Sequence, residues 1–149
     1  MVDALRETRR VLAADGTLLD LRPLSSRCDI EVVTPAHAVP LGEVDATGCM
    51  ADDMAADRAA HQVVEAGWFV PCRETFFGVE FYWDTVAEME SFMEQSKRMG
   101  EVRPSYADLN KAFRELSEAA SGGGRLRCRR PTMLAAYRKA ASDDGDPDA

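Results

Sequence analysis

The residues that could bind a metal or act as nucleophiles are few and scattered. The chain has 149 residues, with two histidines, His37 and His61, and four cysteines that lie far apart. A zinc site would need Cys49 or Asp52 beside a histidine, but no ligand pair has the spacing of a zinc motif. A cysteine paired with a histidine could form a nucleophile, yet nothing in the local sequence supports it. We therefore predict no metal site, assign no catalytic residue and expect reduced thiols.

The net charge of the chain disfavours two classes of binding partner. A formal net charge of −8 disfavours nucleic acid and anionic membranes, because binding to phosphates depends on clustered Lys and Arg. The arginines between residues 125 and 130 alternate with Leu126 and Cys128, which is typical of a half-exposed strand. The sequence has no apolar run of ~20 residues and no signal-peptide core, so we expect a cytoplasmic protein with no membrane segment.

In the first third of the chain, helical periodicity is followed by a short apolar run. Apolar residues at helical spacing predict a helix over Val2–Ala14, which ends before Gly16. Thr17–Leu21 reads as a strand buried on both faces of a parallel sheet. Prolines and glycines then predict an irregular excursion over residues 23–50, in which only Asp29–Val33 could form a brief strand.

The rest of the chain continues the alternation of helix and strand. The patterns predict a helix ending at Gly67, a strand over Arg73–Trp83, a helix from the capping box at Thr85 to Met99, a helix from Ser105 to Ala120, and two strand segments separated by Pro131, the second over Thr132–Arg138. This order indicates an α/β fold. We expect a single domain over residues 1–139 and a disordered acidic tail over residues 140–149.

Three segments resemble a known family. ALRETRRVLAADGTLLDLRP resembles the helix, glycine turn and fifth strand of class I S-adenosylmethionine-dependent methyltransferases, with Leu5, Glu7, Arg10, Val11, Leu12 and Gly16 in register. AAHQVVEAGWFVPCRETFFGVEFYW resembles the next helix and sixth strand. MLAAYRKA resembles the closing seventh strand, which is antiparallel. The resemblance implies the C-terminal half of that domain, a partial Rossmann-like sheet in which the last strand lies between Thr17–Leu21 and Arg73–Trp83.

The resemblance also implies what is missing. The family's cofactor-binding half, with its glycine-rich first turn, has no counterpart here, and the chain contains no Gly-x-Gly-x-Gly. S-adenosylmethionine is the cofactor expected for the family, but we do not expect it to bind this chain alone. We accordingly assign no cofactor-binding residue.

Arg22, Ser25 and Arg27 follow the strand that resembles the fifth strand, whose carboxyl end borders the substrate pocket in the family. The resemblance therefore implies substrate-facing candidates there, and we add His37 from the following excursion and Tyr82 from the aromatic strand. The alternative for the charged, serine-containing turn is a plain solvent-facing loop. A solvated or packed side chain is the alternative for His37.

Two functions remain open at this stage. In the first, the chain is the substrate-side half of a methyltransferase, inactive alone and acting largely by positioning an acceptor. In the second, it is a non-enzymatic remnant domain that is oligomeric or binds a small molecule. Without the fourth strand of the family, Thr17–Leu21 would have an open edge, so we expect a homo-oligomer, a dimer above all, or a chain that supplies the missing half.

Overall fold

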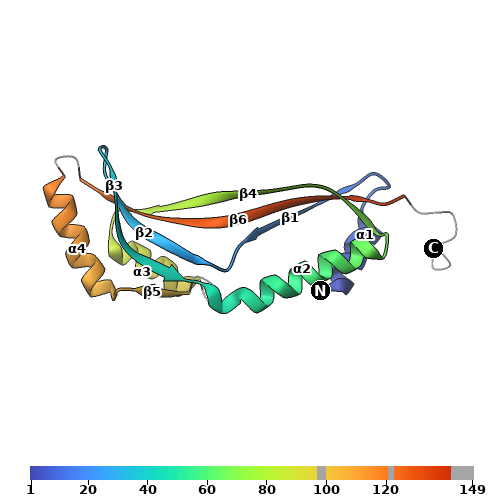
Figure 1. The fold of residues 1–149 in the computed structure, drawn as a ribbon, viewed down its shortest axis with the longest axis horizontal. Coiled ribbons are helices and arrows are strands. Elements are labelled where there is room, and N and C mark those ends of the chain that lie inside the picture. The colour runs from blue at the N-terminus through green and yellow to red at the C-terminus, as the bar shows by residue number, and fades with distance from the viewer. Residues whose placement is uncertain (97–99, 121–122, 142–149) are drawn as a thin grey trace. The chain divides into compact units, whose positions relative to one another are not determined.

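Three consecutive strands follow the first helix, and helices and strands alternate from the second α-helix onward (Figure 1). The structure is a computed structural model that describes residues 1–96, 100–120 and 123–141. Its elements are α1 (Val2–Val11), β1 (Thr17–Pro23), β2 (Arg27–Val33), β3 (Ala38–Asp45), a short 3₁₀ turn (Thr47–Cys49), α2 (Met50–Glu65), β4 (Phe69–Trp83), α3 (Val86–Gln95), β5 (Glu101–Arg103), α4 (Tyr106–Ala119) and β6 (Arg125–Lys139). The predicted α/β class is therefore confirmed. No helix of the described residues is long and apolar enough to cross a membrane.

The strands form an open antiparallel sheet of six strands. Its order is β1-β6-β2-β3-β5, and β4 pairs with β6. The last strand thus has both β1 and β4 as neighbours, which is the position predicted for it. A main-chain hydrogen bond of 2.9 Å from Lys139 N to Gly16 O, and another of 2.8 Å from Leu24 N to Pro131 O, flank the pairing of β1 with β6.

The prediction that the first strand is buried on both faces is wrong. Burial along β1 alternates, and the side chains of Leu19 and Leu21 are 63% and 61% exposed. Antiparallel sheets can leave one face to solvent, whereas parallel sheets are covered on both faces. A run of leucines therefore signals a strand here, but it does not report what packs on each face.

The predicted irregular excursion over residues 23–50 is also wrong, because β2 and β3 form a hairpin there. Pro35 lies in the turn, where Thr34 N donates to His37 O over 2.9 Å. Pro40 lies at a bulge, where the pairing partner shifts from Gly42 opposite Ile30 to Pro40 opposite Glu31. Prolines that usually break strands are thus accommodated at a turn and at an irregularity. The brief strand predicted over Asp29–Val33 forms part of β2.

The final strand is continuous, so the prediction of two segments separated by Pro131 is wrong. Pro131 has no amide hydrogen, but its carbonyl accepts the hydrogen bond from Leu24 N at the point where β1 has ended. The end of the predicted helix at Met99 lies outside the described residues, and so does the predicted tail from residue 142 onward.

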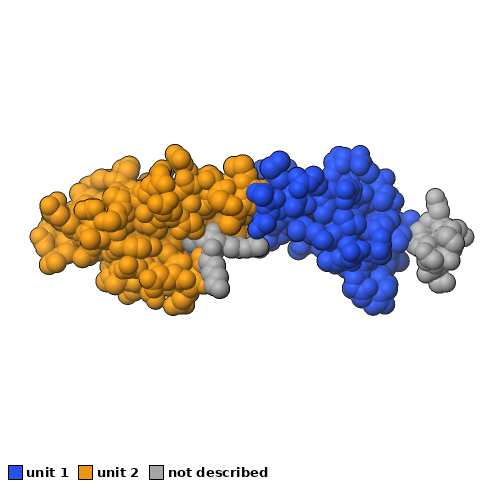
Figure 2. All heavy atoms as spheres, turned by 90° about the horizontal axis from the view of Figure 1, so that it is seen from below, with its two compact units in different colours: residues 1–22, 51–76, 133–149 blue, residues 23–50, 77–132 orange. Residues whose placement is uncertain are grey.

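The chain divides into two compact units, coloured separately in Figure 2. Unit 1 comprises residues 1–22, 51–76 and 133–149, and unit 2 comprises residues 23–50 and 77–132. Long strands contribute to both, since the boundary falls within β4 and within β6. The single domain over residues 1–139 stays a prediction, and each unit is described by itself below.

Unit 2 has a closed apolar core beneath α3 and α4. The hydroxyl of Thr85 accepts a hydrogen bond of 3.1 Å from Glu88 N, and Glu88 Oε2 accepts one of 3.0 Å from Asp84 N, which confirms the predicted capping box of α3. The core is built from both helices and four strands: Cys28, Ile30, Val32, Val44, Trp83, Val86, Met89, Met93, Leu109, Phe113, Leu126 and Cys128.

Unit 1 has fewer buried side chains. Its helices α1 and α2 lie on one side of β1 and β6 (Figure 1), and its buried apolar residues are Ala59, Val63, Phe69, Met133 and Ala135. Gly67, at a φ of +70°, ends α2. Gly67 N donates to Val64 O and Trp68 N to Val63 O, both over 3.0 Å, as in a Schellman motif. The end of α1 is held by Lys139 Nζ, which donates to Leu12 O over 2.7 Å.

Candidate functional site

Unit 1 contains an apolar cavity between its two helices and β1. Its volume is about 210 Å³. All its lining residues belong to unit 1: Met1, Leu5, Leu18, Leu19, Asp20, Arg22, Ala56, Ala60, Val63 and Tyr137. A concave, largely apolar space with a few polar groups is the usual character of a small-molecule site, so we take this partly open cavity as the candidate functional site.

The local sequence explains why the cavity is open. In β1, alternation places Leu18, Asp20 and Arg22 at less exposed positions than Leu19 and Leu21. In α2, Ala56, Ala60 and Val63 recur at helical spacing and face the same cavity. Because Ala56 and Ala60 have only a methyl side chain, space remains between α2 and the strand.

Arg22 is bound by carboxylates beside the cavity. Its Nη2 lies 2.8 Å from Asp57 Oδ1, its Nε lies 3.0 Å from Asp20 Oδ1, and its Nη1 donates to Asp53 O over 3.4 Å. Burial lowers the pKa of Arg22, but the hydrogen bond to Asp57 and the charges of Asp20 and Asp57 outweigh it and hold the pKa above its usual value. The guanidinium therefore stays charged, and its charge is balanced within the protein.

Tyr137 is an uncharged polar side chain at the same place. Burial first, and then the negative charge of Asp20, raise the pKa of its hydroxyl above the usual value. The hydroxyl therefore stays protonated at neutral pH and can donate a hydrogen bond. Tyr137 also borders a neighbouring hollow that shares Arg22 and Ala60 and adds His61 and Glu74.

That S-adenosylmethionine does not bind this chain alone stays a prediction. A cofactor cradle in an open α/β sheet needs glycines where a strand turns into a helix, so that the backbone can approach the ligand. Gly42 and Gly100 lie against the backbones of Arg103 and Asp45 in unit 2, and Gly16 lies against Leu12, whereas Gly48, between β3 and α2, has open space around it. The cavity of about 210 Å³ is also smaller than the ~300–1,000 Å³ of sites for larger ligands.

Among the substrate-facing candidates, Arg22 lies at the cavity and the others lie in unit 2. Ser25 is in the short connection between β1 and β2. Arg27 begins β2, and its Nε lies 3.3 Å from Asp45 Oδ2 while most of its side chain is exposed. The structure does not bring Arg27 into the cavity of unit 1, and the role of each candidate stays a prediction.

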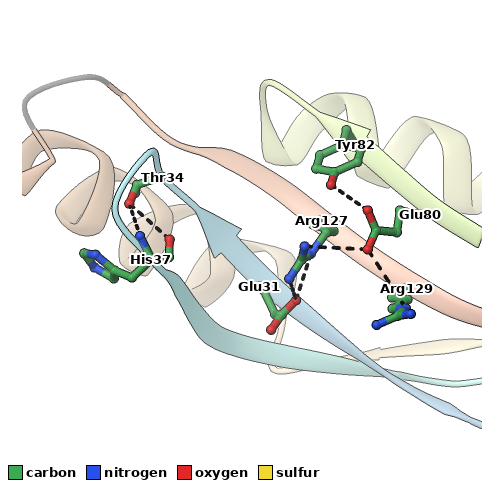
Figure 3. Close-up of polar contacts among 7 residues, drawn as sticks. All are labelled: Glu31, Thr34, His37, Glu80, Tyr82, Arg127 and Arg129. Atoms are coloured by element: carbon green, nitrogen blue, oxygen red, sulfur yellow. Dashed lines mark hydrogen bonds and ion pairs between the residues drawn. The ribbon is translucent and has the colours of Figure 1, made fainter. Parts of the chain in front are cut away.

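His37 and Tyr82 lie at separate places in unit 2 (Figure 3). His37 is in the β2–β3 turn, where its backbone bonds to Thr34 and its ring points away from the other labelled side chains. Tyr82 donates to Glu80 Oε2 over 2.7 Å on the strand beside β6.

The arginine-rich start of β6 forms a ladder of ion pairs on one face of unit 2 (Figure 3). Arg127 Nη2 lies 2.7 Å from Glu31 Oε2, and Arg127 Nη1 lies 3.6 Å from Glu80 Oε1. Leu126 and Cys128 between the arginines are buried, which confirms the predicted alternation. This face is therefore held by opposite charges from β2, β4 and β6 rather than presenting unpaired cations.

The sequence did not point to the residues that open the cavity. Ala56 and Ala60 read as part of an apolar helix stripe, and Tyr137 read as part of a buried strand. Two alanines one helical turn apart leave space only when the side chains of the facing elements do not fill it. That condition depends on the packing of α2 against β1, which a single sequence does not display.

Buried thiols are a second feature that the sequence did not single out. All the cysteines are free, and Cys28 and Cys128 are buried on neighbouring strands of unit 2. The hydrogen bond with Cys28 and then burial raise the pKa of Cys128. Cys72, by contrast, is exposed. Within the described residues, no group of three or more His, Cys, Asp or Glu side chains could hold a metal ion.

Comparison with known proteins found no relative of this chain. The chain matches no protein-family model, no curated protein and no solved structure.

Proposed function

We propose that the chain is the substrate-side half of a methyltransferase-like fold, inactive alone, which works with a polypeptide that holds S-adenosylmethionine. The single observation that carries the proposal is the place of β6, which pairs with β1 and β4, and at its start also with β2, in an antiparallel sheet. The last strand of the methyltransferase domain has the same relation to the counterparts of β1 and β4. Between β1 and β4 the chain passes through the β2–β3 hairpin and then α2, so a helix precedes β4 as in a strand–helix–strand crossover, with the hairpin as an insertion.

The free edge of β1 is a second support. Among the described strands, β6 is the sheet neighbour of β1, so the other edge of β1 has no strand beside it. In the methyltransferase fold that edge pairs with the fourth strand, which belongs to the cofactor-binding half. An unpaired edge with exposed Leu19 and Leu21 suits completion by another strand, because unpaired amides and carbonyls bind extended chain readily.

On this proposal the chain contributes orientation rather than a reactive group. A methyl transfer needs an acceptor atom aligned with the sulfonium methyl, and holding the two in line accounts for much of the rate enhancement. Arg22, at the carboxyl end of β1, would lie nearest the partner's cofactor site and could fix the acceptor's orientation. Its ion pairs with Asp20 and Asp57 hold it rigidly.

The test begins with the DNA that adjoins the coding region. We expect it to encode, in frame or as a separate chain, a strand followed by a glycine-rich turn and helix. That polypeptide, expressed together with this chain, should bind S-adenosylmethionine stoichiometrically at micromolar concentration in calorimetric titration, while this chain alone should not. Micromolar binding by this chain alone, or the absence of any such coding segment, would contradict the proposal; the latter would favour the non-enzymatic remnant.

A further inference from the structure

We propose that the cavity of unit 1 binds a small, neutral aromatic molecule of one or two fused rings, and that this chain binds it without a partner. The site goes beyond the proposed function, because it needs neither the cofactor nor the polypeptide that would hold it. The cavity, its lining and its charged margin all belong to unit 1.

The volume of the cavity is the first property that favours a particular class of ligand. An apolar cavity of ~150 Å³ in a protein interior takes up benzene. The cavity of about 210 Å³ is partly open to solvent, and its walls have room for a somewhat larger ring system. A single substituted ring or an indole-sized molecule therefore matches the space.

The lining selects an apolar ligand. Leu5 from α1, Leu18 from β1 and Val63 from α2 present aliphatic side chains from three elements, with Ala56 and Ala60 between them. A planar ring can contact all three elements at once, and removal of its surface from water drives binding by ~25 cal/mol per Å². A flexible chain of the same volume would lose rotamer freedom on entering.

The charges at the margin select a neutral ligand. Arg22 is paired with Asp20 and Asp57, so an anion would meet two carboxylates beside the one guanidinium. A cation would be attracted by the two carboxylates, but both are already paired with Arg22, and the rest of the cation would leave water for an aliphatic surface, which is costly. A neutral ring meets neither penalty.

Tyr137 favours a ligand that carries one polar substituent. Tyr137 lines the cavity together with Asp20 and Arg22, and it also borders the neighbouring hollow that contains Arg22 and Asp57, so it lies beside the polar margin. An oxygen on the ring that accepts a hydrogen bond from the Tyr137 hydroxyl should strengthen binding by about twofold to tenfold, the usual net value of one neutral hydrogen bond.

The test uses toluene and 4-methylphenol as probes on the full 149-residue chain. We expect toluene to bind with a dissociation constant on the order of 1 mM or tighter. 4-Methylphenol should bind about twofold to tenfold more tightly, and Tyr137→Phe should abolish that difference without weakening toluene. Methyl NMR should show toluene-dependent shifts at Leu5, Leu18 and Val63, and no shifts at Ile30 and Leu109 of unit 2.

Filling the cavity provides the matched pair of variants. Ala60→Phe places a ring where the ligand would lie and should weaken both probes at least ~10-fold, whereas Ala51→Phe, at an exposed position of the same helix, should leave both unchanged. If Ala60→Phe fails to fold, the methyl shifts of the unaltered chain decide. Absence of saturable toluene shifts at Leu5, Leu18 and Val63, or equal binding by folded Ala60→Phe, would overturn the proposal.

Discussion

The two units differ in how completely they bury their own apolar surface. Unit 2 encloses large side chains, among them Ile30, Met89, Leu109 and Leu126, each with no exposed surface. In unit 1 two of the five buried apolar residues are alanines, and β1 exposes two leucines. Unit 2 therefore has a fully packed apolar core, and unit 1 has a less fully packed one. We therefore expect unit 1 to be the less stable part and the part that binds partners.

The largest expected effect contrasts one leucine from each unit. Leu109→Ala should lower the free energy of unfolding by about 2–5 kcal/mol, because it removes a fully buried side chain and leaves a cavity. Leu21→Ala should change it by less than about 0.5 kcal/mol, because Leu21 is 61% exposed. Urea denaturation followed by circular dichroism measures both. Equal losses in the two variants would remove the distinction between the units.

Self-association should involve the exposed side of β1. A two-fold partner could cover the free edge of β1 together with Leu19 and Leu21, so we expect a dimer by light scattering at micromolar concentration. Leu19→Lys should yield a folded monomer, because the leucine is exposed within the chain and lysine there costs the fold little. Ala51→Lys adds the same charge on α2 and should leave the dimer intact. A measured mass of 16.4 kDa for the natural chain in solution, which is the mass of a monomer, would refute self-association.

A smaller effect should come from the cap of α3. Thr85→Ala removes the acceptor for Glu88 N and should cost about 1 kcal/mol of stability in unit 2. Ser91→Ala, in the exposed interior of the same helix, should cost nothing measurable, since alanine favours helix and the Ser91 hydroxyl accepts an exposed hydrogen bond from Gln95 Nε2. The urea midpoint measures both variants. A neutral Thr85→Ala would mean that packing alone holds the start of α3.

The smallest expected effect is a dependence on acid pH. Hydrogen bonds from the side chain and then the backbone of Thr47 lower the pKa of Asp45, with Arg27 adding a smaller charge effect. A carboxylate with a lowered pKa stabilises the folded chain above its unfolded pKa, and that contribution is lost as pH falls through the folded value. The urea midpoint of the natural chain should therefore drop more between pH 5 and pH 3 than that of Asp45→Asn. Identical drops would show that Asp45 contributes nothing.

The parts of the fold that follow from local chemistry could be predicted from the sequence. The capping box at Thr85, the alternation at Leu126 and Cys128, and the glycine stop at Gly67 each depend on neighbours within a few residues. The β2–β3 hairpin was missed because Pro35 and Pro40 read as breakers, and their tolerance depends on a turn and a bulge that form only with the partner strand.

Among the substrate-facing candidates predicted from the sequence, Arg22 is the one that lies at the candidate site. Arg22 was singled out through the resemblance, and the structure places it beside the cavity. Ala56, Ala60 and Tyr137 were missed, because an alanine stripe and an aromatic strand residue have the same pattern whether the space between them is filled or empty. Volume left between elements is a property of tertiary packing, to which residues distant in the sequence contribute.

Native-state hydrogen exchange tests most directly the claim that the apolar core is fully packed in unit 2 and incompletely packed in unit 1. Exchange rates report the free energy of opening at each amide, and well-packed strands open least. We expect the amides around Ile30 in β2 and Leu126 in β6 to exchange on the order of 100-fold more slowly than those around Leu19 in β1, in the monomeric Leu19→Lys chain as well as in the natural one. Equal protection of β1 and β2 in the monomer would contradict the account.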